Sequence, residues 1–259
     1  MLEFINLQSI PVFLLVFIRV TAFFVVMPLF SYRTIPVPFK IGISFFLAFI
    51  LYYTVDGSAI MFDSTYPFLI LKEMLVGVLI GLIAYIIVSA IQIAGGFIDF
   101  QMGFAIANVI DPQTGAQSPL MGQYFYIIAL LFLLSVNGHH LLIDGIFYSF
   151  EFIPLDRFIP FQDGTIADFV ITSFNKMFVI AFQISIPIVG CLFLVDVALG
   201  IIARTVPQLN VFVVGLPLKI LVSFVVILFF MSLYVSLAKG LFSLMYETMH
   251  RLMQLFGGA

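Results

Sequence analysis

Few side chains in this 259-residue chain could do chemistry, and the stretch that most resembles a metal site is "NGHHLLIDG" at residues 137–145. His139 and His140 are adjacent, so they point to different faces of a helix, whereas Asp144 shares a face with His140 because four residues separate them. Two ligands fall short of the three or four that zinc sites take, and the H-E-x-x-H motif is absent. We therefore interpret the stretch as a polar cluster at a helix end, and we predict no metal site and no cofactor.

Known catalytic signatures are missing as well. The chain contains neither the G-x-S-x-G nucleophile elbow nor a phosphate-binding P-loop. Its one cysteine, Cys191, stands in an apolar run, where a cysteine usually serves as a small packing residue. These residues predict a protein that is not an enzyme.

Two charged residues stand inside long apolar runs, Arg19 in the first run and Asp196 in "LFLVDVALG". A charge at the centre of a bilayer costs roughly 2.5–3.5 kcal/mol on insertion scales, and such residues usually face protein or water. One interpretation is a proton or ion relay, and the other is a contact at a helix or subunit interface. We favour the interface, because a relay needs a chain of titratable groups and the surrounding runs offer few.

The composition indicates an integral membrane protein. The chain is 63% hydrophobic and 9% charged, whereas a soluble domain has roughly 45–50% apolar and about 25% charged residues. So few charges could not cover the surface of a water-soluble fold of this length. The net charge of −3 provides no basic patch that could replace the counterions of a nucleic acid.

The elements that carry these residues are apolar runs, and a spanning helix needs roughly 20 residues. We predict an all-α, polytopic membrane protein of about six kinked helices, at residues 10–30, 39–55, 68–98, 122–150, 170–203 and 211–238. Prolines at 11, 28 and 187 are expected to kink their helices. The motif "GVLIG" places Gly77 and Gly81 on one helix face, where glycines let two backbones approach closely, so we assign both to an interface.

The orientation is weakly specified, because Lys and Arg near the helix ends nearly tie between the two sides. One side has compact basic turns without acids, which favours the cytoplasm for that side and an outer location for both termini: Arg33, Lys40, Arg204 and Lys219. Lys72 and Glu73 belong to the other side, where bases and acids are mixed. A near tie is unusual for an ordinary bundle and suggests that some apolar helices lie outside lipid.

One polar stretch interrupts the apolar pattern, "FQMGFAIANVIDPQTGAQSPLMGQYF" at residues 100–125. Asp111 can cap a turn, Pro112 fixes φ and Gly115 permits positive φ, so "DPQTG" is turn chemistry. Irregular backbone at membrane depth is tolerated only inside protein or beside a water-filled cavity. At that depth the stretch would line or block a pore, whereas as an external loop it would carry no such meaning.

Three blocks of the sequence together resemble one known family. They are "FIDFQMGFAIANVIDPQTGAQSPLMGQYF", "LLFLLSVNGHHLLIDG" and "DVALGIIARTVPQLNVFVVGLPLKI". In order and spacing they are similar to the R subunit of the flagellar type III export gate, the FliR family, and the resemblance covers essentially the whole chain. The stretch "RTVPQLNVFVVGLPLK" (204–219) is its most specific signal.

The resemblance implies a P-like helical part, residues 1–165, followed by a Q-like helical hairpin, residues 166–259. It implies assembly with P and Q subunits (FliP and FliQ) into the pore through which unfolded flagellar proteins cross the cell membrane, at the basal body of the flagellum. The other export components, FlhB and FlhA, would be neighbours, and the energy would come from the proton-motive force and the export ATPase.

The resemblance also implies roles for particular residues. The loop between the third and fourth predicted helices would plug the closed pore, with these members: Phe104, Asn108, Asp111, Pro112, Gln113, Thr114, Gly115, Gln117 and Leu120. Asp99 and Gln101 flank this loop, and we interpret them as its anchors at a helix or subunit interface. The turn that would face the cytoplasm comprises Arg204, Pro207, Gln208, Asn210 and Lys219.

Two alternatives remain open. Injectisome export gates of virulence systems share the architecture but fit these three blocks less well. A secondary transporter would show inverted repeats and broken helices around a midplane site, and no convincing internal repeat is found here.

Overall fold

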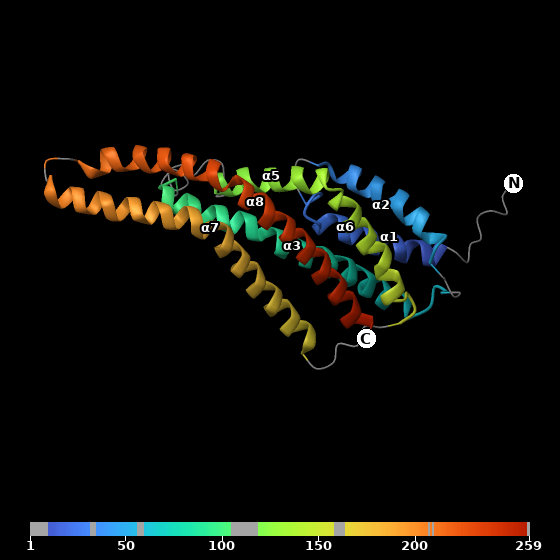
Figure 1. Ribbon diagram of the computed structural model, residues 1–259. Coiled ribbons are helices and arrows are strands. Elements are labelled where there is room, and N and C mark those ends of the chain that lie inside the picture. Colours follow the sequence, from blue (N-terminus) through green and yellow to red (C-terminus); the bar gives the residue numbers. More distant parts are fainter. Residues whose placement is uncertain are drawn as a thin grey trace. The chain divides into compact units, whose positions relative to one another are not determined.

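The computed structural model describes residues 10–31, 35–55, 60–104, 119–157, 164–206, 208 and 210–257. Over these ranges the chain forms seven helices and no strand (Figure 1), which confirms the all-α class. The helices are α1 (Ile10–Val26), α2 (Val37–Tyr52), α3 (Tyr66–Met102), α5 (Leu120–Ser135), α6 (Gly138–Phe152), α7 (Thr165–Thr205) and α8 (Val211–Gly257).

The helix expected at 122–150 is two helices, which is why the described residues contain seven and not six. The break falls after α5, at Val136 and Asn137, and Asn137 has a φ of 58°. Asparagine is among the few residues that adopt this left-handed conformation readily. A hydropathy pattern cannot reveal the break, because apolar residues continue on both sides of it.

Helix α8 continues to Gly257, well beyond the expected end at residue 238. The added part is amphipathic, whereas the part before it is predominantly apolar. Its buried side chains recur every three or four residues along one face, as expected for a helix packed on one side: Leu241, Phe242, Met245, Met249, Leu252, Met253 and Phe256.

Two of the three predicted proline kinks are wrong. Pro11 lies in the first turn of α1 and Pro28 follows the end of that helix. The first turn needs no backbone donor, so proline is tolerated there without bending the helix. Pro187 lies inside α7, as expected, and α8 contains Pro217.

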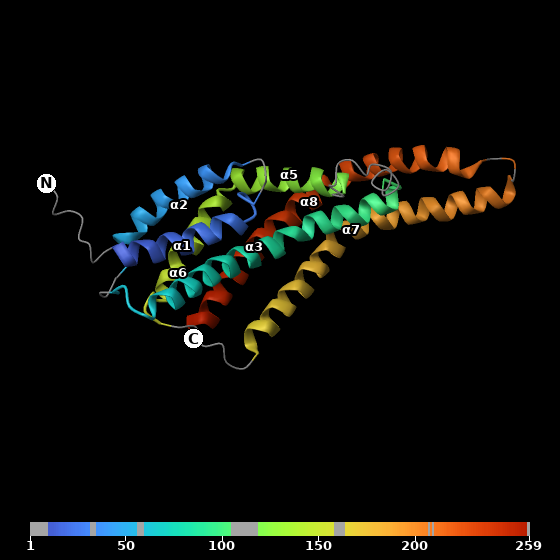
Figure 2. The same cartoon turned by 180° about the vertical axis from the view of Figure 1, so that it is seen from behind.

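The chain divides into two compact units, and α3, α7 and α8 each contribute to both (Figures 1 and 2). The first unit comprises residues 1–87, 137–174 and 243–259, and the second comprises residues 88–136 and 175–242. In the first unit, α1 packs beside α2 in both views. Phe13 and Phe45 meet edge to face there, with ring centroids 5.5 Å apart, and Val16, Val20 and Phe23 of α1 are fully buried.

The second unit is built from the later part of α3, α5 and a hairpin of α7 and α8, whose facing halves run side by side in both views (Figures 1 and 2). The Tyr234 hydroxyl of α8 donates to the Phe125 carbonyl of α5 at 2.6 Å. The two rings also pack, with centroids 4.9 Å apart. This contact fixes α8 against α5.

Three helices of the described residues are long and apolar enough to cross a membrane, namely α3, α7 and α8, and α5 with α6 would make a fourth, broken span. The apolar window of α3 is 61% buried inside the protein, whereas those of α7 and α8 are each 17% buried. Helix α3 therefore packs mainly on protein, while α7 and α8 turn most of their apolar surface outward. The chain is a multi-span membrane protein, and the division near residue 165 into P-like and Q-like parts stays a prediction.

Candidate functional site

The predicted plug loop falls largely outside the described residues. Seven of its members lie in that part of the chain, between residues 105 and 118: Asn108, Asp111, Pro112, Gln113, Thr114, Gly115 and Gln117. Its two ends are described, with Phe104 directly after α3 and Leu120 as the first residue of α5. We call the described residues that hold these ends the loop frame: Gly95, Asp99, Gln101, Gly103, Pro119, Met121, Gly122, Asp196 and Lys219.

At the upstream end of the loop, α3 stops in a Schellman motif. The Phe104 N–H donates to the Asp99 carbonyl at 3.0 Å, and the Gly103 N–H donates to the Phe100 carbonyl at 3.2 Å. Gly103 has a φ of +91°, a conformation that this motif requires and glycine adopts without strain. A Cβ at Gly103 would also lie 2.8 Å from Leu216 Cδ1. The backbone therefore leaves the helix at a defined point.

At the downstream end, α5 is capped by a residue of another helix. Its N-cap is Pro119, which makes no side-chain cap. Both carboxylate oxygens of Asp99 instead accept the Met121 N–H, at 3.1 and 3.0 Å. The side chain of Asp99 is 1% exposed, and a carboxylate at a helix N-terminus is stabilised by the free N–H groups and the helix dipole. One residue of the last turn of α3 thus holds the start of α5.

The same two helices touch backbone to backbone one turn away. A Cβ at Gly95 would overlap the Gly122 backbone and lie 2.8 Å from the Met121 carbonyl carbon. A Cβ at Gly122 would lie 2.8 Å from the Gln92 carbonyl oxygen. Pairs of glycines permit this approach in membrane helices, where close packing replaces the hydrophobic effect as the driving force. The base of the loop is therefore closed by main-chain contact.

Gly95→Ala is expected to separate α3 from α5 and to lower the yield of folded protein, because the added methyl has no space against backbone atoms. Thermal unfolding of the detergent-solubilised protein measures the loss, with Gly190→Ala as the matched control, since nothing lies within 4 Å of a Cβ at Gly190. Equal melting temperatures for the two variants would show that the close contact is dispensable.

A second tie connects the loop frame to the α7–α8 hairpin within the same unit. The Gln101 amide donates to Asp196 Oδ2 at 2.8 Å, and Lys219 forms an ion pair with Asp196 Oδ1. Asp196 and Lys219 border a groove of about 370 Å³, which Gly103, Leu199, Phe212 and Leu216 also line. The sequence shows no partner for Asp196 in its apolar run. In the structure Asp196 has two partners, Gln101 and Lys219.

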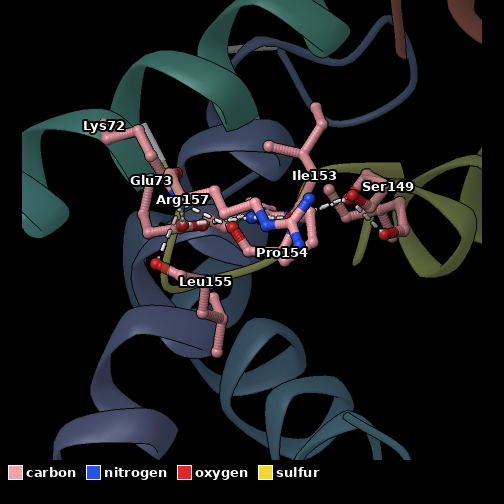
Figure 3. Close-up of polar contacts among 9 residues, drawn as sticks. Lys72, Glu73, Ser149, Ile153, Pro154, Leu155 and Arg157 are labelled. Atoms are coloured by element: carbon pink, nitrogen blue, oxygen red, sulfur yellow. Dashed lines mark hydrogen bonds and ion pairs between the residues drawn. The ribbon is translucent and has the colours of Figure 1, made fainter. Parts of the chain in front are cut away.

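Arg19 is fully buried in the first unit, in a cluster of which several other members are labelled in Figure 3. Its Nε and Nη2 bind both carboxylate oxygens of Glu73. Nη1 donates to the Ser149 carbonyl and hydroxyl at 2.8 and 3.2 Å, and Nη2 also donates to the Ile153 carbonyl at 2.8 Å. The guanidinium lies 4.0 Å from the Phe150 ring centroid and uses all five of its N–H donors.

Lys72 completes this cluster. Its ammonium lies 2.6 Å from Glu73 and donates to the carbonyls of Pro154, Leu155 and Arg157 at 2.8–3.1 Å (Figure 3). Carbonyls at and beyond a helix C-terminus have no partner within the helix, and cations there are favourable. Two cations and one carboxylate thus fasten the end of α6 and the turn after it to α1 and α3.

The cluster was not expected from the sequence, where Lys72 and Glu73 resemble loop charges of one membrane side. The structure buries both, with Lys72 5% and Glu73 0% exposed. A signal was present, since the two opposite charges are adjacent at the start of a long apolar helix. The saturated contacts of Arg19 support the interface interpretation over the relay.

The glycine motif of α3 lies against α1. A Cβ at Gly77 would overlap the Arg19 carbonyl and lie 2.9 Å from Ala22 Cβ, and one at Gly81 would lie 3.0 Å from the Phe23 carbonyl oxygen. The two glycines bring α1 close enough for Arg19 to reach Glu73.

The remaining sequence-predicted positions are more exposed. Arg204, Gln208 and Asn210 are exposed at the α7–α8 turn, and Pro207 lies outside the described residues. The Asn210 carboxamide accepts the Phe212 N–H at 3.2 Å and caps α8. Lys219 lies further along α8, paired with Asp196. Within the described ranges, no three His, Cys, Asp or Glu side chains gather closely enough to hold a metal ion.

Comparisons with known proteins agree on one family. The profile of "Bacterial export proteins, family 1" matches residues 10–245. The flagellar biosynthetic protein FliR of Bacillus subtilis is 59% identical over 95% of this chain and 96% of its own length. FliR of Escherichia coli is 26% identical over 93% and 90%, and the Yop proteins translocation protein T of Yersinia pestis is 27% identical over 88% of each chain. These matches confirm the resemblance seen in the sequence and the expectation of a non-enzymatic export protein.

Proposed function

Because the chain belongs to the FliR family of bacterial export proteins, a component of the flagellar type III export gate, we propose that it forms the export pore together with P and Q subunits (FliP and FliQ). Unfolded flagellar proteins cross the cell membrane through this pore at the base of the flagellum. The observation that carries the proposal is 59% identity to a flagellar relative along nearly the full length of both chains.

The exposed apolar surface supports assembly into a larger complex. The α7–α8 hairpin exposes large side chains along both helices, including Phe193, Phe212, Leu228 and Phe229, the last two at 77% and 81%. Contiguous apolar surface of this extent marks a protein or membrane interface. In the proposed gate, the hairpin lies against lipid and neighbouring subunits, and the exposed turn with Arg204 faces the cytoplasm, toward FlhB and FlhA.

The loop of residues 104–120 closes the pore in this proposal. Two features support the role: it carries a single charge, Asp111, with Gly, Pro, Gln, Ser, Thr and Asn more frequent than in the flanking runs, and its ends are held by a buried cap and a glycine contact. A loop that buries little apolar area is easily displaced. Neutral amides can hydrogen-bond to any passing backbone, whereas a charged plug would bind some substrates tightly and repel others.

Co-expression with candidate P and Q subunits tests the proposal. We expect the purified chain to run as one member of a complex with several copies of both partners, and native mass spectrometry of the detergent-solubilised particle measures its composition. The reason is the exposed apolar surface, which needs partners to cover it. A chain that is monodisperse alone and transports a solute in liposomes would instead be a secondary transporter.

The injectisome gate of a virulence system is the second candidate. The Yop proteins translocation protein T of Yersinia pestis is 27% identical, as distant as the flagellar relative of E. coli at 26%. The 59% match to a flagellar protein favours the flagellar gate. Deletion of the encoding gene is expected to abolish swimming motility, and a motile strain with normal filaments would contradict the assignment.

A further inference from the structure

Asp196 divides its two carboxylate oxygens between two helices. Oδ2 accepts the Gln101 amide of α3 at 2.8 Å, and Oδ1 pairs with the Lys219 ammonium of α8. Asp196 itself belongs to α7, so one side chain joins three helices of the second unit. Removal of Gln101 breaks the link between α3 and the hairpin. Removal of Lys219 breaks the link within the hairpin.

The α3 end of this link lies where the predicted plug loop begins. Gln101 lies two residues before Gly103. Gly103 adopts a left-handed conformation and ends the helix. Leu216 of α8 lies against Gly103, 2.8 Å from where a Cβ would stand. The hairpin therefore contacts the start of the loop through a hydrogen bond and through a side chain at the terminating glycine.

The two ties of the loop frame differ in burial. Asp99, which holds the downstream end, is 1% exposed and binds backbone N–H groups. The side chains of Asp196 and Lys219 are 36% and 20% exposed and border the groove of about 370 Å³. A buried carboxylate cannot leave its donors without a large desolvation penalty, whereas partly exposed partners lose less when they separate.

We propose that the Gln101–Asp196–Lys219 bridge is a releasable joint, through which a displacement of the α7–α8 hairpin reaches the upstream end of the plug loop. The Asp99 cap and the Gly95–Gly122 contact stay in place and act as the fixed side of the frame. The joint holds the closed arrangement, and pressure of neighbouring subunits or substrate on the hairpin breaks it. This inference rests on the proposed function of the loop as the plug.

Gln101→Leu isolates the joint, because it removes the link to α3 while the Asp196–Lys219 pair remains. We expect a gate complex of normal composition whose closed-state ion conductance in planar bilayers rises about two- to tenfold, which corresponds to one ordinary hydrogen bond. Gln183→Leu, the same substitution at an exposed position of α7, is the matched control and should conduct like the wild type.

Charge exchange between α7 and α8 supplies a rescue. Asp196→Lys and Lys219→Asp each place like charges together, and each should leak. The double exchange restores the ion pair, and the Gln101 amide can turn its oxygen toward the new ammonium, so the conductance should return toward that of the wild type. A double variant that leaks as much as either single variant would overturn the bridge as the cause.

Deletion of residues 111–117, measured in the same assay, separates the two proposals. If that deletion leaks and Gln101→Leu does not, the joint is wrong and the plug stands. If neither variant leaks, the plug is wrong and the joint falls with it. Normal complex mass in every variant is required for either conclusion, and a loss of assembly in Gln101→Leu would assign this residue to folding and overturn the joint.

Discussion

Deletion of residues 111–117 is expected to leave the gate assembled but unable to hold back small ions. Assembly survives because the segment is polar, and the contacts that join α3 to α5 lie outside it, at Asp99, Gly95 and Gly122. The seal is lost because the deleted residues are the ones proposed to fill the pore. Native mass spectrometry measures the assembly, and conductance of the purified complex in planar bilayers measures the leak.

A length-matched replacement serves as the control for that deletion. If residues 111–117 are exchanged for an equal number of Gly and Ser residues, we expect most of the seal to remain, since the seal requires a compliant and neutral segment and not a particular sequence. An equal number of Asp residues should disturb export of acidic substrates by repulsion. Unchanged conductance after the deletion would remove the loop from the conduit.

Arg19→Met is expected to have the largest effect on stability. The substitution leaves the buried Glu73 with Lys72 as its remaining cation and removes the guanidinium donors from the carbonyls of Ser149 and Ile153. Breaking a buried ion pair from one side costs about 3–5 kcal/mol, a large part of the 5–15 kcal/mol that holds a typical domain. The measurement is thermal unfolding and yield of the detergent-solubilised protein.

Arg251→Met is the matched control for this substitution. Arg251 pairs with Glu247 on the surface of α8, with side chains 57% and 52% exposed, and exposed pairs contribute roughly 0–1 kcal/mol. The double variant Arg19→Met, Glu73→Leu should lose less than the two single variants together, because each single variant already breaks the Arg19–Glu73 pair. A stable Arg19→Met protein with altered ion flux would support the relay that the sequence left open.

Much of the architecture could be predicted from hydropathy and turn chemistry. Five of the six expected helices have counterparts, because long apolar runs interrupted by Pro, Gly and acidic turns leave few alternatives. The remaining expected helix was wrong because it is broken between α5 and α6, where Asn137 adopts a positive φ. Apolar residues on both sides of Asn137 conceal the break. The amphipathic end of α8 was missed because a hydropathy count ignores the face on which apolar residues lie.

The candidate site shows the same division. Loop composition and the flanking Asp99 and Gln101 could be recognised in the sequence, since polar residues are rare in so apolar a chain. The residues that bind Asp99 and Gln101 could not be recognised in the sequence. Asp196 and Lys219 lie at similar distances along the chain from the α7–α8 turn, one before it and one after it. Their pairing is therefore evident only once the two helices are known to form a hairpin. Glu73 meets Arg19 from 54 positions away, which no local pattern specifies.

By itself, the sequence determined that this chain is a helical membrane protein of the export-gate family, because hydrophobic composition and short motifs act locally along the chain. The tertiary structure decided which charges pair, where glycines let helices touch and which of the two ties to the loop is buried. Those properties depend on the distance between residues of different helices. Distance sets the strength of an ion pair, and burial sets the cost of leaving a charge unpaired.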